Sequence, residues 1–193
     1  MTELIALSSA GFVLRPYLAD DAAAFAAAVR ESMATLGPWM PWAEAGFDEA
    51  QALAWFAACD AGRADGSSHE FGIFRGGVFV GGAGLNQLNP AHALCNLGYW
   101  VRTSAQRQGA ASAAVVALAH YAFRDLNQTR VEIVVAEGND ASLGVARKAG
   151  AVHECLARNR LVLDGAPVAA HVFSLVPGDL RTDPSAPPQP RSA

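Results

Sequence analysis

The chain has 193 residues, with 14 Lys or Arg against 18 Asp or Glu, so its formal net charge is −4 at pH 7. This length predicts one domain with a full hydrophobic core, and the acidic balance disfavours a general nucleic-acid-binding surface. The three cysteines (Cys59, Cys95 and Cys155) lack metal-ligand spacing, and no segment is typical of a signal peptide or membrane span, so we expect a soluble cytoplasmic protein with buried thiols and no metal.

The first elements are a strand and a helix. Residues 12–16 begin with Phe-Val-Leu and end at Pro16, which indicates a strand that stops at the proline. Two aspartates, Asp20 and Asp21, can cap a helix that ends near Met33. The apolar face of this helix is predicted to contain Phe25 and Val29.

A second helix and a hairpin follow a segment without regular structure. Two prolines exclude a helix or strand between residues 36 and 42. Asp48 can cap a helix that runs to about residue 61, and a hairpin is predicted over residues 71–85, with its turn at 75–77. The predicted buried face of the helix comprises Leu53, Phe56 and Ala57.

The second half alternates strands with helices before a Pro-rich end. The predicted elements are a strand at 97–102, a helix at about 112–123, a strand at 129–136, a short helix ending near 150, and a hairpin over 151–175. The order β-α-α-β-β-β-α-β-α-β-β indicates a mixed α+β fold in one domain, residues 1–176. Residues 177–193 are predicted to form a disordered Pro-rich tail.

The loop between the strand at 97–102 and the following helix indicates an anion site. The first amides of a helix have no intrahelical partner, and the helix dipole is positive there. Gly109, Ala110 and Ala111 carry almost no side chain, so a phosphate can approach the backbone closely. The loop lacks the lysine of a mononucleotide P-loop and the three glycines of a dinucleotide fingerprint.

Three segments carry a family resemblance. Residues 106–111 match Gln/Arg-x-x-Gly-x-Gly/Ala, Asn139-x-x-Ser142 precedes Lys148-x-Gly150, and Trp-Met-Pro-Trp occupies residues 39–42. With these segments the chain resembles the GNAT superfamily of acyl-CoA-dependent N-acetyltransferases, in its ribosomal-protein-alanine (RimJ/RimL-like) branch. The resemblance covers about residues 11–176. It implies a mixed central sheet with flanking helices, in which the two central strands splay apart.

The resemblance also implies that acetyl-CoA is the co-substrate. Its pantetheine arm would lie between the splayed strands and bond to their backbone, with its pyrophosphate on the loop amides. Arg102 or Arg107 could add positive charge near the phosphates, and each is equally well explained as a solvated side chain. The implied cofactor-binding residues are Trp100, Val101, Arg102, Gln106, Arg107, Gln108, Gly109, Ala110, Ala111, Ser112, Asn139 and Ser142.

Two of these residues have alternative interpretations. Asn139 would bond the pantetheine arm, or it would cap the helix that follows it. Ser142 would give a proton to the leaving thiolate, or it would bond locally to the backbone at the helix start. The sequence alone does not decide between these roles for either residue.

The residues for proton transfer depart from the family pattern. Asn96 stands where many members carry a glutamate, and Leu161 stands where the ribosomal branch carries another. An asparagine cannot take a proton at neutral pH but could hold a water, so Asn96 is kept with Ser142 as a candidate catalytic residue. The other candidate bases are Glu70, His69 and His92.

A poor base favours an acceptor that is easily deprotonated. An α-amino group titrates near 7.7–8.0, whereas a lysine amine titrates near about 10.4. We therefore expect acetyl transfer to a protein N-terminal α-amine. The candidate acceptor-binding residues are Trp39, Met40, Trp42 and Glu70, although the aromatic side chains could equally pack over the helix pair.

Other functions remain open at this level. The alternatives are acetyl or succinyl transfer to a small amine, amino acid or antibiotic, a non-catalytic acyl-CoA-binding module, and a peptide-binding fold without CoA. Partners are expected to be acetyl-CoA and the amine acceptor, with no nucleic acid or membrane. A homodimer is possible because the apolar segment 168–175 could pair across subunits, or it could complete its own sheet.

Overall fold

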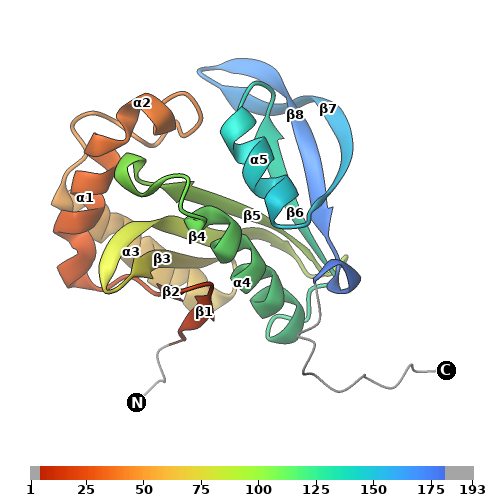
Figure 1. The fold of residues 1–193 in the computed structure, drawn as a ribbon, viewed down its shortest axis with the longest axis horizontal. Helices are drawn as coiled ribbons and strands as arrows, with labels where there is room; N and C mark the ends of the chain where they lie inside the picture. Colours follow the sequence, from red (N-terminus) through yellow and green to blue (C-terminus); the bar gives the residue numbers. More distant parts are fainter. Residues whose placement is uncertain (1–4, 181–193) are drawn as a thin grey trace.

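The computed structural model describes residues 5–180, which form one mixed eight-stranded sheet in the order β1-β2-β3-β4-β5-β6-β8-β7 (Figure 1). The strands are β1 Leu7–Ser9, β2 Phe12–Arg15, β3 His69–Arg75, β4 Val78–Asn89, β5 Leu94–Val101, β6 Arg130–Ala136, β7 Val152–Leu163 and β8 Ala166–Leu175. The helices are α1 Ala22–Glu31, α2 Met33–Leu36, α3 Glu49–Asp65, α4 Ala110–Arg124 and α5 Asp140–Lys148. The predicted element order is confirmed, with β1 and the one-turn helix α2 as additions.

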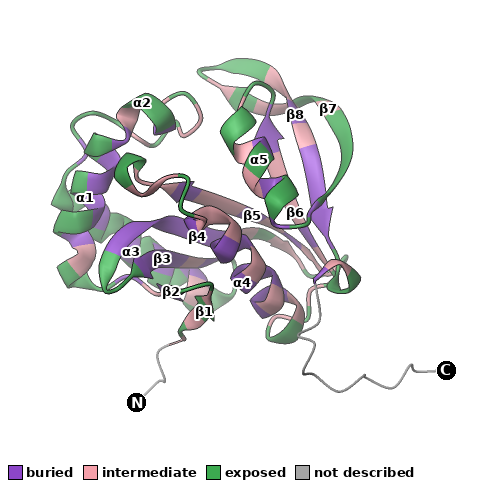
Figure 2. Cartoon of the chain, viewed as in Figure 1, coloured by how far each residue is buried: buried purple, intermediate pink, exposed green. Residues whose placement is uncertain are grey.

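Helices cover both faces of the sheet. α4 and α5 lie on one face, and α1 and α3 lie on the other (Figure 1). The α4 face of the sheet is apolar and includes Leu97, Ile133 and Phe173, which are at most 2% exposed. The opposite face is aromatic, and Phe25 of α1 contacts Trp100 of β5 edge to face, with ring centroids 5.4 Å apart. The buried stripes of α1 and α4 are visible in Figure 2.

The sheet is split at its centre. β5 and β6 are parallel neighbours, but their register covers only Leu94–Asn96 against Arg130–Glu132. Beyond these pairs β5 bonds only to β4, and β6 bonds only to β8. Residues 97–101 therefore diverge from residues 133–136 and leave unpaired strand edges facing each other, which confirms the predicted splay.

The N-terminal helices show where local patterns succeed and fail. Asp48 caps α3, accepting a hydrogen bond from the Gln51 amide at 2.9 Å, as predicted. The predicted buried face of α3 is correct at Phe56 and wrong at the other two positions, because Leu53 is 44% exposed and Ala57 is also exposed. The buried residues of α3 are Ala52, Phe56, Cys59 and Gly62.

The carboxylate predicted to cap α1 has another role. Asp21 makes no side-chain hydrogen bond to the amides of α1. It accepts two bonds from the Arg15 guanidinium, at 2.7 and 2.9 Å, and one from the Leu18 amide. Phe25 and Val29 of α1 are buried as predicted.

The two hairpins are confirmed. Gly76 and Gly77 both have positive φ, as a two-residue hairpin turn requires. β8 lies between β6 and β7, so the segment 168–175 completes its own sheet and cannot pair across subunits. β7 is the edge strand and is mostly exposed, and it includes Cys155, which was expected to be buried.

The C-terminal boundary differs from the expected one. Pro177–Asp179 form a 3-10 turn, and Leu180 is only 8% exposed and packs in the core. The first residues of the expected tail are therefore part of the fold, and residues 181–193 lie outside the described residues. No helix within residues 5–180 has the length and apolar character needed to cross a membrane.

Candidate active site

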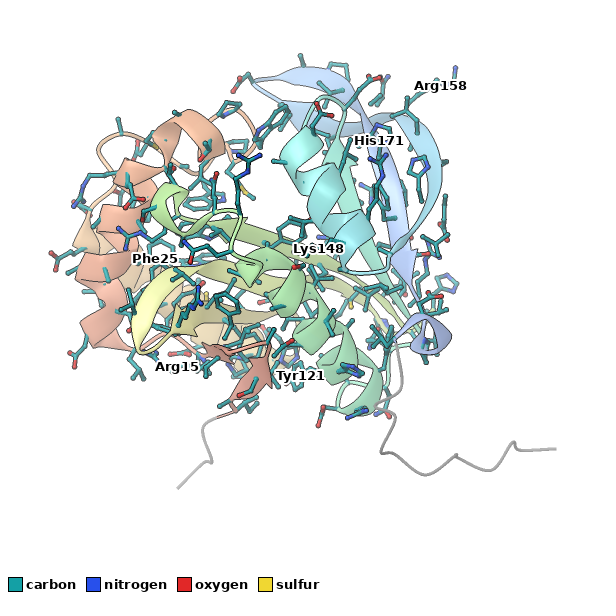
Figure 3. All side chains as sticks on the ribbon, viewed as in Figure 1. Arg15, Phe25, Tyr121, Lys148, Arg158 and His171 are labelled. Carbon is teal, nitrogen blue, oxygen red and sulfur yellow. The ribbon has the colours of Figure 1, made fainter. Side chains whose placement is uncertain are left out.

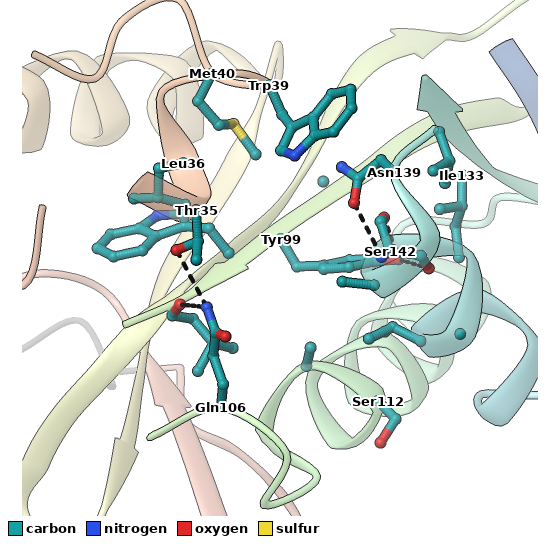
Figure 4. Close-up of a pocket in the computed structure, with 18 of the residues that line it drawn as sticks. Thr35, Leu36, Trp39, Met40, Tyr99, Gln106, Ser112, Ile133, Asn139 and Ser142 are labelled. Atoms are coloured by element: carbon teal, nitrogen blue, oxygen red, sulfur yellow. Dashed lines mark hydrogen bonds between the residues drawn. The ribbon is translucent and has the colours of Figure 1, made fainter. Parts of the chain in front are cut away.

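A cleft of about 520 Å³ opens where β5 and β6 part (Figure 4). Its walls come from the splayed strands, the N-terminal turns of α4 and α5, the loop after α2, and the end of β7. Of the predicted site residues, those that line the cleft are Trp39, Met40, Trp100, Val101, Gln106, Arg107, Gly109, Ala110, Ala111, Ser112, Asn139 and Ser142. Five do not line it: Trp42, Glu70, Asn96, Arg102 and Gln108.

The loop before α4 presents free amides to the cleft. Gly109, at φ +90°, is the N-cap of α4, and Arg107 also has a positive φ of 62°. Within residues 5–180 no group accepts a hydrogen bond from the amides of residues 107–112, whereas the Ala113 amide already donates to the Gly109 carbonyl. Free amides at the positive end of a helix dipole are the features that the predicted anion site requires.

Side chains from other elements hold this loop in place. Gln106 Nε2 donates to Thr35 Oγ1 at 3.2 Å and to the Val101 carbonyl at 3.3 Å, which ties the loop to α2 and β5 (Figure 4). Gln108 is a bracing residue, because its Oε1 accepts from Arg75 at 2.8 Å and its Nε2 donates to Ser104. Its expected cofactor contact is therefore limited to its backbone amide.

The two candidate phosphate-binding arginines have different surroundings. Arg102 forms an ion pair with Glu31 of α1, and the Ser104 amide donates to the same carboxylate at 2.7 Å. The hydrogen bond from Arg102 is the main reason that the pKa of Glu31 falls to about 2. Arg102 is thus held by Glu31 and does not line the cleft, which makes it the weaker of the two phosphate-binding candidates. Arg107 lines the cleft and forms no ion pair with any described residue.

Tyr99 and Ser142 form a polar pair on the cleft wall (Figure 4). The Tyr99 hydroxyl lies 3.0 Å from the Ser142 carbonyl oxygen and 3.0 Å from Ser142 Oγ. Burial raises the pKa of Tyr99 to about 12, so the phenol stays protonated at neutral pH. The single phenolic proton can be donated to the Ser142 carbonyl or to Ser142 Oγ, and in the second arrangement the serine hydroxyl can donate into the cleft.

Tyr99 is the residue that the sequence reasoning missed. The sequence indicates only that Tyr99 belongs to a strand, because its partner Ser142 is 43 residues away. The available signal was strand alternation, which puts Tyr99 on the same face as Leu97 and Val101, beside the segment that contains the Asn-x-x-Ser motif.

Asn139 caps α5, and its Oδ1 accepts a hydrogen bond from the Ser142 amide at 3.1 Å. The helix-capping interpretation therefore holds for its side-chain oxygen. Its Nδ2 bonds to no described residue.

The acceptor end of the cleft is apolar. Trp39 and Met40 line it from the loop after α2, and Leu161 and Leu163 line it from β7. Trp42 packs instead among aromatic rings, 6.0 Å from both Phe47 and Trp100 by centroid, so the packing interpretation holds for it. Leu161 thus occupies the cleft wall but brings no carboxylate to it.

The candidate bases lie behind the cleft rather than in it. Asn96 Nδ2 donates to Asn86 Oδ1 at 2.9 Å, and Asn86 Nδ2 lies 3.4 Å from Glu70 Oε1. His69 is buried against Tyr121, 3.2 Å from its hydroxyl, and burial lowers the pKa of His69. His92 is exposed in the β4–β5 connection. No cluster of three metal-ligating side chains occurs among residues 5–180.

Comparisons with known proteins agree with this geometry. Residues 12–152 match the model of the acetyltransferase (GNAT) domain family. A relative from Bacillus subtilis (strain 168), provisionally named ribosomal N-acetyltransferase YdaF, is 32% identical over 102 residues, 53% of this chain. The match spans 56% of that curated relative's length.

Solved structures extend the likeness to nearly the whole fold. A Vibrio cholerae protein, provisionally named a ribosomal-protein-serine acetyltransferase, is 32% identical with a TM-score of 0.80, covering 92% of this chain and all of its own. Mycobacterium smegmatis RimJ, solved with CoA-disulfide, is 24% identical with a TM-score of 0.83, covering 93% of this chain and 89% of its own. The resemblance seen in the sequence is therefore confirmed, and the chain belongs to the GNAT family of acetyltransferases.

Proposed function

We propose that this protein transfers an acetyl group from acetyl-CoA to the α-amine at the N-terminus of a protein in the cytoplasm. The observation that carries this proposal is the split between β5 and β6, which opens directly onto the unpartnered amides of residues 107–112. A strand edge and an anion site in one cleft fit a ligand with an amide-bearing arm and a diphosphate.

The cleft residues fit CoA in charge and shape. The loop amides and Arg107 would bind the pyrophosphate, and the space beside Gly109 is open, with nothing within 4 Å of the place a Cβ would take. The pantetheine amides would bond to the free edges of β5 and β6 and to Asn139 Nδ2. Lys148, near the end of α5, is a second cation lining the cleft (Figure 3).

Tyr99 and Ser142 suit the departure of the thiolate. A phenol with a pKa of about 12 is a weaker acid than a thiol, which titrates near about 8.5, so full proton transfer from Tyr99 is unfavourable. The pair can instead stabilise the thiolate by a hydrogen bond from Ser142 Oγ, which Tyr99 strengthens by donating to the same oxygen. The serine is thus proposed as a hydrogen-bond donor to the leaving group.

The acceptor end favours an α-amine over a lysine side chain. Within the described residues the charged side chains that line the cleft are Arg107, Asp140 and Lys148, and none comes from the acceptor end formed by Trp39, Met40, Leu161 and Leu163. A weakly basic amine needs less help to lose its proton. The names of the Bacillus subtilis and Vibrio cholerae relatives, which refer to ribosomal proteins, support a protein acceptor.

Two matched peptides test the proposal. One has a free N-terminus and no lysine, and the other has the same sequence with an acetylated N-terminus and one internal lysine. We expect release of CoA thiol and a mass increase of one acetyl group with the first peptide only. Modification of the lysine peptide alone, or of small amines but neither peptide, would contradict the α-amine assignment. Binding of acetyl-CoA without transfer to any amine would indicate a non-catalytic module.

A further inference from the structure

A hydrogen-bonded polar chain crosses the face of the sheet that carries α1 and α3. It runs from Asn96 on β5 through Asn86 on β4 to Glu70 on β3. Asn96 and Asn86 are direct partners in the β4–β5 register, so both side chains project from the same face. Most other residues of this face are glycine or aromatic, and they include Gly72, Gly82, Gly84, Gly98 and Trp100.

Two glycines connect Glu70 to the cleft. The register aligns Glu70 with Gly84, and Gly84 with Gly98, in one row across three strands. A Cβ on Gly84 would lie 1.8 Å from Glu70 Oε2, so the carboxylate lies over β4, in space that only a glycine leaves free. The carboxylate thus reaches from its own strand toward β5.

The space above Gly98, the last residue of this row, is free of other atoms. Gly98 lines the cleft, and nothing lies within 4 Å of the place its Cβ would take. Neighbouring strands are about 4.8 Å apart, so the carboxylate over β4 is one strand spacing from the cleft wall. One water molecule over Gly98 can span that distance, and the Asn96 Oδ1 atom can accept a hydrogen bond from it.

We propose that Glu70 accepts the proton of the attacking amine through a water held over Gly98 by Asn96. This inference rests on the proposed acetyl transfer. It assigns to β3 the proton acceptor that Asn96 and Leu161 cannot supply.

The surroundings of Glu70 suit this role. Burial raises its pKa to about 7, against smaller opposing effects of Asn86 and Arg63. Arg63 of α3 donates to the Glu70 carbonyl oxygen at 2.5 Å. Two further titratable groups interact with the carboxylate, Cys59 of α3 and Tyr17 before α1, and burial raises the pKa of both, so they are neutral near pH 7. A proton acceptor works best when its pKa lies near the operating pH.

Glu132 is the other carboxylate beside the chain. It pairs with Asn96 in the parallel register, so it belongs to the same face. Its carboxylate is held by Arg130 at 2.9 Å and approached by Arg160 at 4.0 Å. Its carboxylate is thus engaged by two arginines, and it lies on β6, on the opposite side of Asn96 from Glu70, which makes it a good control.

The step balances without any further reactant. The neutral amine nitrogen forms a bond to the thioester carbon and gives one proton, through the water, to Glu70. The carbon–sulfur bond breaks, and its electron pair leaves with the CoA sulfur, stabilised by Ser142 Oγ. The thiolate then takes one proton from solvent and Glu70 releases one, so that amine and acetyl-CoA become amide and CoA thiol.

The test is the pH profile of Glu70→Gln. The rate is measured with the α-amine peptide and expressed per neutral amine, a fraction obtained from an NMR titration of the peptide. For the wild type we expect kcat/KM to fall below a midpoint near pH 7, the pKa of Glu70. For Glu70→Gln we expect kcat/KM to drop by about 10²–10⁴-fold, with a flat profile, while the affinity for CoA is unchanged.

Controls separate this role from a structural one. Glu132→Gln is expected to keep both the rate and the acid limb. Asn96→Asp added to Glu70→Gln puts a carboxylate on the adjacent strand, and we expect it to restore part of the rate and an acid limb. Glu70→Gln removes a buried charge, so it is expected to melt no lower than the wild type above pH 7.

The possible results separate the two proposals. A wild-type protein that acetylates no amine refutes the proposed function and this inference with it. A wild type that acetylates the peptide, with Glu70→Gln retaining both its rate and its acid limb, overturns only the role of Glu70. A Glu70→Gln protein that loses rate but keeps the wild-type acid limb also overturns it, because a structural defect would then explain the loss.

Discussion

Gly109 offers a direct test of the anion site. At φ +90° its backbone is left-handed, a conformation that costs other residues about 1–2 kcal/mol. Gly165, in the β7–β8 turn, has φ +76° and likewise nothing within 4 Å of a Cβ. Gly109→Glu and Gly165→Glu should therefore lose similar amounts of folding free energy, although only the first places a carboxylate at the α4 N-terminus.

The effect on CoA binding follows from the added charge. A carboxylate about 5 Å from one phosphate charge is repelled by about 0.8 kcal/mol at an effective dielectric of 80 and about 3.3 kcal/mol at 20. This range corresponds to a dissociation constant for CoA that rises by about fourfold to a few hundredfold. Because Gly109 lines the cleft, where the proposed diphosphate would be partly shielded from solvent, we expect Gly109→Glu to fall in the upper half of this range.

Calorimetric titration of CoA into both variants measures the effect, with melting curves as the check on folding. Gly109→Ala adds the backbone strain without the charge, so it should bind CoA more tightly than Gly109→Glu does. The penalty of Gly109→Glu should shrink as salt is raised, since screening weakens repulsion between partly exposed charges. Equal CoA affinities for Gly109→Glu and Gly165→Glu would refute a diphosphate site at this loop.

Three further outcomes follow from the site. Tyr99→Phe and Ser142→Ala should each lower kcat by about 10–100-fold. Because the two hydroxyls act as one unit, the double variant should lose less activity than the product of the two single fold-losses. A kinetic double-mutant cycle in which the two free-energy losses simply add would contradict this. Asn139→Asp keeps the cap of α5 and should melt like the wild type, yet raise KM for acetyl-CoA, whereas Asn139→Ala should also lose about 1 kcal/mol of stability. Since Arg102 depresses the pKa of Glu31 to about 2, the ion pair adds to the free energy of unfolding above the unfolded-state pKa near 4.5. This contribution is lost as the pH falls toward 2. The melting temperature of Glu31→Gln should therefore fall less between these pH values than that of the wild type.

Local signals in the sequence predicted most of the elements. The paired glycines at 76–77 and the Asp48 cap act within a few residues, so their outcome depends little on the rest of the fold. The buried face of α3 was predicted only in part because residues 52–59, the middle turns of the helix, are all Ala, Cys or larger apolar residues. A helix with apolar residues on all sides has no unique inward face until its partners fix one.

Features of the site that lie within one stretch of sequence could likewise be predicted, whereas contacts between distant residues could not. The anion loop is contiguous in the chain, so its amides could be found from the sequence. The Arg102–Glu31 pair joins residues 71 apart, and the Tyr99–Ser142 pair joins residues 43 apart. Local sequence patterns span only a few residues, so they reveal neither the ion pair that holds Arg102 nor the hydroxyl pair that brings Tyr99 to the site.

The alternation of β5 gives the site its two sides. Leu97, Tyr99 and Val101 project toward α4, and Asn96, Gly98 and Trp100 project toward α1 and α3. In the proposed reaction, a thioester held where β5 leaves β6 would meet the leaving-group donors from one face and the attacking amine from the other. A base beside the thiolate donors would interfere with them, because a nearby carboxylate repels a developing thiolate. A proton acceptor that reaches the cleft from β3, across two glycines, avoids this repulsion, since the sheet itself separates the two charges.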